Sequence, residues 1–83
     1  MVTQTQNNTK EEGMKELIKI QLDELYEQLP GRPAVISLRK AAEIVGIGER
    51  TLMQDGSFPL NKMNGRYYVP VVTLAKWLVQ KMA

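Results

Sequence analysis

Residues 37–78 read SLRKAAEIVGIGERTLMQDGSFPLNKMNGRYYVPVVTLAKWL. Ser37 is a favourable N-cap for a helix over residues 38–45, and Gly46 supplies the left-handed residue that often ends a helix. A second short helix follows over roughly residues 49–55. Two short helices joined by a glycine-containing turn of about three residues are typical of a helix-turn-helix.

A β-hairpin is predicted next along the chain. Asn64-Gly65 is a strong signal for a two-residue turn, because a type I′ turn needs positive φ at both positions. The flanking runs 60–63 and 66–69 are the expected strands, and the second is rich in aromatic residues. Pro70 then opens a last helix over residues 71–82. Helix-turn-helix, hairpin and closing helix together predict a small winged helix-turn-helix of the α+β class.

Before this domain, which we place at residues 34–83, the sequence predicts a disordered polar tail over residues 1–8 and an amphipathic helix over residues 9–29. Thr9 and Glu12 fit a capping box, and the sequence Leu-Pro-Gly ends the helix. Apolar residues recur at helical spacing along it: Met14, Leu17, Ile18, Leu22, Leu25 and Leu29. Two interpretations remain open, since the stripe suits packing on the same domain and also self-association or binding of a partner protein.

Composition excludes several functional classes. The chain has 83 residues, no cysteine and no histidine. Disulfides, zinc sites with thiolate or imidazole ligands, and Cys–His or Ser–His–Asp catalysis are therefore excluded. We expect no enzyme activity, no cofactor and no metal. Long apolar runs and a signal peptide are both lacking, so we expect a cytoplasmic protein.

Charge is divided unevenly along the chain. Residues 1–29 carry three lysines against six acidic residues, a net charge of −3. Residues 30–83 carry eight lysines and arginines against three acidic residues, a net charge of +5. A basic domain of this kind favours a polyanionic partner, and double-stranded DNA is the usual one.

The motifs within residues 37–78 resemble the winged helix-turn-helix proteins of the MerR-like superfamily, and among them the excisionases and the AlpA-type regulators. The resemblance rests on Ser37-Leu38, Ala41-Ala42-Glu43, Gly46-Ile47-Gly48-Glu49-Arg50-Thr51-Leu52, Phe58-Pro59, Asn64-Gly65-Arg66-Tyr67-Tyr68-Val69-Pro70 and Leu74-Ala75-Lys76-Trp77-Leu78. It implies a DNA-binding protein of a mobile element that acts in DNA recombination as an excisionase-like directionality factor, in transcription regulation, or in both. A tyrosine-type integrase would be the protein partner in excision.

The second short helix, about residues 48–55, would then be the recognition helix in the major groove. With Leu52 pointing inward, Arg50 and Gln54 point outward at about 100° per residue. Both side chains suit bidentate contacts to base edges. Glu49 and Thr51 are second choices. In this arrangement Ile47 is expected to fill the angle between the two helices.

Residues outside the recognition helix are expected to contact the DNA backbone or the minor groove. Arg50 is the only cation of that helix, so phosphate attraction has to come from elsewhere. The candidates are the start of the first short helix and the hairpin over residues 60–69, which acts as the wing. Tyr67 is preferred over Tyr68 as the exposed tyrosine. The full set of these candidates is Arg39, Lys40, Lys62, Asn64, Arg66 and Tyr67.

A non-catalytic protein-interaction module is the alternative. The acidic residues of the recognition helix, Glu49 and Asp55, favour it, as does the unassigned helix over residues 9–29. In that case the winged scaffold would persist without DNA binding, and the N-terminal helix would contact a partner protein. DNA binding through several cations weakens steeply with salt, which distinguishes the two functions.

Overall fold

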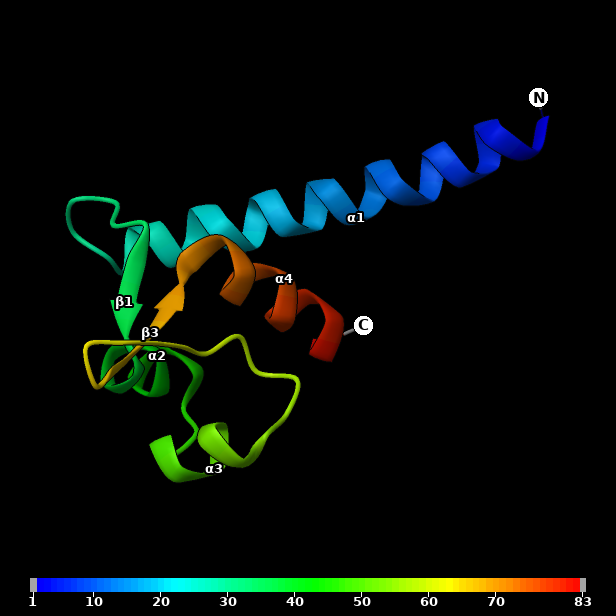
Figure 1. The fold of residues 1–83 in the computed structure, drawn as a ribbon. Coiled ribbons are helices and arrows are strands. Elements are labelled where there is room, and N and C mark those ends of the chain that lie inside the picture. The colour runs from blue at the N-terminus through cyan, green and yellow to red at the C-terminus, as the bar shows by residue number, and fades with distance from the viewer. Residues whose placement is uncertain (1, 83) are drawn as a thin grey trace.

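The computed structural model describes the backbone of residues 2–82 and the side chains of residues 13–81. These residues form a small α+β fold with four helices and one three-stranded antiparallel sheet (Figure 1). The elements in chain order are α1 (Val2–Glu27), β1 (Val35–Ser37), α2 (Leu38–Val45), α3 (Glu49–Gln54), β2 (Asn61–Met63), β3 (Arg66–Pro70) and α4 (Val71–Met82).

Strand β3 is the centre of the sheet. The strand order is β1-β3-β2, and both pairs are antiparallel. The predicted hairpin is confirmed: Asn64 and Gly65 have φ of 52° and 77°, as a type I′ turn requires. The third strand, β1, pairs Ile36 with Val69, so the extended run before α2 is part of the sheet.

Helices α2 and α4 have the predicted bounds. Ser37 caps α2, and its hydroxyl accepts a hydrogen bond from the Lys40 N–H at 3.1 Å. Gly46 is left-handed with φ of 79°, as predicted for the residue that ends α2. Helix α4 begins directly after Pro70, and the Val71 N–H donates to the carbonyl of Ala34 at 2.9 Å. Local capping signals therefore determine α2, whereas the start of α4 is held by a contact with the segment before β1.

Helix α1 differs from the prediction at both ends. It begins at Val2, so the disordered tail predicted for residues 1–8 is wrong from residue 2 onward, and Thr9 lies within the helix. Residues 2–12 contain neither proline nor glycine, so nothing in the sequence stops the helix from extending there. At the other end α1 stops at Glu27, two residues before the predicted end. The last turn tightens instead, and the Leu29 N–H donates to the Tyr26 carbonyl at 3.2 Å.

The C-terminal half of α1 packs on α4, which runs alongside it in Figure 1. Leu25 and Leu29 are 1% and 3% exposed, and Ile18 and Leu22 are partly buried against the core. Packing on the same domain is therefore confirmed for this part of the apolar stripe. One cluster joins α1 to the other elements: Leu25, Leu29, Ile36, Leu38, Ala41, Leu52, Phe58, Val69, Val71, Leu74, Ala75 and Trp77.

Shortening Leu25 to alanine should destabilise the fold by about 2–5 kcal/mol, because it leaves a cavity between α1 and the core. Leu17→Ala in the same helix is the matched control. Leu17 is 51% exposed, so this change should cost less than about 1 kcal/mol. Urea unfolding of dilute protein measures both. Equal losses for the two variants would contradict the packing of α1 on the domain.

Candidate nucleic-acid interface

The chain passes from α2 to α3 within three residues. The Gly46 N–H donates to the Ala42 carbonyl at 2.8 Å and ends α2. Gly48 is extended and precedes α3, and its carbonyl accepts a hydrogen bond from the Leu52 N–H at 3.1 Å. Leu52 is 2% exposed and belongs to the core cluster. This side chain therefore anchors the inner face of α3.

Ile47 lies in the middle of this turn and is 38% exposed. The prediction that it fills the angle between the two helices is wrong. Ala41 and Leu52, at 0% and 2% exposure, are the buried side chains of α2 and α3 in this region, together with Leu38. Because Leu52 reaches the core from α3, Ile47 stays near the surface.

The prediction that Arg50 and Gln54 point outward from α3 is confirmed. Arg50 and Gln54 are exposed, and each lies about 160° around the helix axis from the buried Leu52. Glu49 and Thr51 are also exposed, one on each side of Leu52. The helix ends at Gln54, one residue earlier than expected, and Asp55 is its C-cap.

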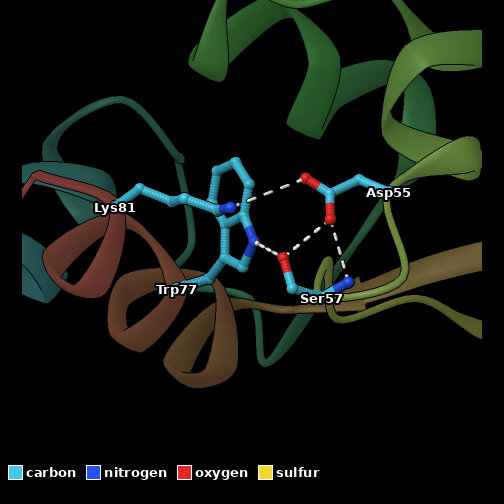
Figure 2. A network of polar contacts seen from close by, with 4 residues as sticks. All are labelled: Asp55, Ser57, Trp77 and Lys81. Carbon is cyan, nitrogen blue, oxygen red and sulfur yellow. Dashed lines mark hydrogen bonds and ion pairs between the residues drawn. The ribbon is translucent and has the colours of Figure 1, made fainter.

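A polar network fixes the end of α3 to α4 (Figure 2). Asp55 Oδ1 accepts hydrogen bonds from the Ser57 N–H at 2.9 Å and from the Ser57 hydroxyl at 2.7 Å. Trp77 Nε1 in turn donates to Ser57 Oγ at 3.1 Å. Lys81 Nζ lies 3.9 Å from Asp55 Oδ2 and 5.7 Å from the centroid of the Trp77 ring. We call these four residues the Asp55–Lys81 network.

The Phe58 ring packs against the same tryptophan. The centroids of Phe58 and Trp77 are 5.0 Å apart with the rings at 87°, and both side chains are 6% exposed. Edge-to-face pairs of this kind stabilise beyond the area they bury. The prediction that Trp77 is a core residue is confirmed. The indole therefore holds the segment after α3 by an apolar contact and a polar one.

The hairpin presents its cations and its tip to solvent. Lys62, Asn64 and Arg66 are all exposed, as a wing requires. Lys62 Nζ lies 5.6 Å from the centroid of the Tyr67 ring on the neighbouring strand, and Lys62 and Tyr67 are paired in the register. Arg66 is paired with Met63 beside the turn.

The prediction that Tyr67 is the exposed tyrosine of β3 is wrong. Tyr67 is half-buried and packs against the core cluster. Side chains alternate along a strand, so Tyr67 shares a sheet face with Val69, which is 0% exposed. Tyr68, also half-buried, is on the opposite face together with Arg66 and Asn61. Alternation along the strand gives this assignment once Val69 is known to be buried.

Arg39 and Lys40 are exposed in the first turn of α2. Lys40 Nζ lies 3.7 Å from Glu43 Oε2, an exposed pair of the kind that contributes little stability. Among the side chains at residues 13–81, no carboxylate lies within 4.0 Å of the cationic groups of Arg39, Arg50 or Arg66. These charges are therefore not neutralised by a described neighbour.

No match was found for this chain among protein-family models, curated proteins or solved structures. In the described part of the chain, no group of three or more potential metal ligands occurs. None of the described helices has the length and hydropathy needed to cross a bilayer.

The Asp55–Lys81 network should make stability depend on pH in the acid range. The Ser57 hydroxyl and the Ser57 N–H, with a smaller contribution from Lys81, hold the pKa of Asp55 below its ordinary value of 3.8. A carboxyl group with a lowered folded-state pKa stabilises the fold above its unfolded pKa. That contribution is lost as the pH falls below 3.8 and through the lower pKa of the folded state.

Asp55→Asn should therefore lower the thermal midpoint at neutral pH, and the difference from wild type should shrink on acidification below 3.8. Thermal unfolding followed by circular dichroism over a pH series measures this difference. Glu16→Gln, an exposed carboxylate on α1 outside the network, is the control. A difference between Asp55→Asn and wild type that stays constant with pH would contradict the network's role.

Proposed function

We propose that this chain is a winged helix-turn-helix protein that binds double-stranded DNA in a sequence-specific manner. The outward face of α3 is the observation that carries the proposal. Arg50 and Gln54 are exposed opposite the buried Leu52, and the Asp55–Lys81 network fixes the end of the same helix to α4. An exposed helix face held by its own core is suited to insertion into the major groove.

Base recognition is assigned to two side chains of α3. The Arg50 guanidinium suits a bidentate contact to guanine, and the Gln54 amide suits one to adenine. Each good pair contributes about 1–3 kcal/mol of discrimination against a wrong base. Thr51 and Glu49 flank them and are secondary contacts. Because α3 has only six residues, few base pairs can be contacted by one copy.

Phosphate contacts are assigned to cations outside α3. Lys62 and Arg66 lie on either side of the hairpin turn, and Arg39 and Lys40 begin α2. Such contacts supply affinity and register but little sequence information. Asn64 is at the turn itself, where its positive φ already accounts for an asparagine. Tyr68 replaces Tyr67 in this set, because Tyr67 packs against the core cluster.

The distribution of charge supports the side of the molecule that carries α3 as the DNA interface. In Figure 1, α1 runs along one side of the fold and α3 lies at the opposite side, with the sheet and α2 between them. Residues 1–29 carry the net charge of −3, and residues 30–83 carry +5. The acidic helix is thus kept away from the recognition helix, where it would repel phosphates.

The biological role that fits is that of an excisionase-like directionality factor or transcriptional regulator of a mobile element. Motifs within residues 37–78 support it through their likeness to those families. A single small module buries too little surface for high specificity, so we expect several copies to bind repeated sites. A tyrosine-type integrase is the partner in the excision role.

Selection from a random duplex library, followed by anisotropy titrations at several salt concentrations, tests the proposal. Arg50→Ala should weaken binding to the selected site by about 1–3 kcal/mol and relax the preference at one base pair. Arg66→Ala should weaken binding to all sequences and reduce the salt slope by about 1. Lys76→Ala, an exposed cation of α4, is the control and should change neither.

Two outcomes would contradict DNA binding: no enrichment of any sequence, or no binding to duplexes at low salt. Either outcome would favour the second candidate, a protein-interaction module. The observation behind that candidate is the exposure of Leu17 and Ile20 on α1, at 51% and 54%.

A further inference from the structure

One apolar side chain is exposed on the helix assigned to base recognition. Met53, in α3, is 46% exposed and is not among the apolar side chains packed on the core cluster. The other exposed side chains of this helix are all polar or charged: Glu49, Arg50, Thr51 and Gln54. Packing within the fold therefore leaves much of the Met53 side chain in contact with water.

Met53 is a neighbour of Arg50 on the surface of α3. The two residues are three positions apart, which corresponds to about 60° around the helix axis and about 4.5 Å along it. Residues at this spacing have Cβ atoms about 5–6 Å apart. Leu52, about 100° from Met53, is the side chain that points into the core. A surface that Arg50 contacts is therefore within reach of Met53 as well.

The major groove of duplex DNA offers such a side chain one kind of methyl group. Guanine, cytosine and adenine present hydrogen-bond donors and acceptors at this edge, whereas thymine also presents its C5-methyl group. Methionine is unbranched and flexible, so its thioether adapts to an irregular apolar surface. Contact between the two groups removes apolar area from water, which is favourable.

We propose that Met53 contacts the C5-methyl group of a thymine in the DNA site and so determines a base preference. This inference rests on the proposed function, in which α3 occupies the major groove. Successive bases on one strand are about 3.4 Å apart, so the spacing of Arg50 and Met53 spans about one or two base pairs. The thymine therefore lies within about two base pairs of the guanine that Arg50 contacts.

The contact supplies base discrimination without charge attraction. Burial of one methyl-sized apolar group corresponds to about a fourfold change in the dissociation constant. Loss of the contact changes no phosphate neutralisation, so the salt dependence of binding should stay as it is. Arg66 differs in this respect, because its removal should reduce the salt slope. Met53 therefore has a readout that a phosphate contact lacks.

Replacement of thymine by deoxyuridine tests the contact, because it removes only the methyl group and keeps the hydrogen-bonding groups of the base. Each thymine is replaced in turn in a duplex that carries one copy of the selected site, and fluorescence anisotropy gives the dissociation constants. For wild type, one replacement within about two base pairs of the Arg50-dependent position should weaken binding about fourfold. The other replacements should have smaller effects.

Variants of Met53 link this effect to the side chain. Met53→Ala should bind the thymine and deoxyuridine duplexes equally, because the group that contacts the methyl is gone. Met53→Gln keeps the length of the side chain but is polar, and it should lose the difference as well. Met14→Ala is the matched control, the same change at an exposed methionine of α1, which lies at the opposite side of the fold from α3 (Figure 1).

The control should keep the full difference between the two duplexes. Circular dichroism checks that all three variants keep the wild-type thermal midpoint to within a few degrees, as expected for exposed positions. The salt slope of Met53→Ala should equal that of wild type.

The outcomes separate this inference from the proposed function. Absence of binding to any duplex at low salt would overturn both. Sequence-specific binding without a deoxyuridine effect would overturn the thymine contact alone, as would an effect that Met53→Ala leaves unchanged. A selected site with no thymine within about two base pairs of the Arg50-dependent position would also overturn it.

Discussion

Strand β3 is the constraint on which the rest of the fold depends. It pairs with β1 on one side and β2 on the other, and its fourth residue, Val69, is fully buried. Its last residue, Pro70, is followed directly by α4, whose position in turn determines where α1 packs. The same strand carries Arg66 at the hairpin turn. The strand thus connects the cations of the hairpin to the hydrophobic core.

Local signals in the sequence predicted the elements that those signals determine. Ser37 and Gly46 mark both ends of α2, and Asn64-Gly65 fixes the hairpin turn through positive φ at both positions. Helical spacing from Leu52 also placed Arg50 and Gln54 on the outer face of α3. For the caps and the turn, a single backbone requirement leaves few residue types that satisfy it, so those predictions need no tertiary contact.

Features that depend on tertiary packing were not predictable in the same way. Tyr67 and Tyr68 are equally suited to a strand, and only the burial of Val69 against the helices decides which one faces the core. Ile47 was expected inside, but Leu52 reaches the core from the next helix. Helix α1 was expected to start at Thr9 because of a capping box, but it begins at Val2, since residues 2–12 contain no proline or glycine that would stop it.

The hydrogen bond from Trp77 to Ser57 has a practical consequence. Trp77 is the only tryptophan of the chain, and its indole contacts the segment that directly follows α3. Its fluorescence spectrum depends on the polarity around the indole and on that hydrogen bond. The protein therefore contains an intrinsic optical reporter for whether α3 is attached to α4. Detachment of α3 can be distinguished spectroscopically from fraying of the N-terminal end of α1, which runs away from α4 (Figure 1).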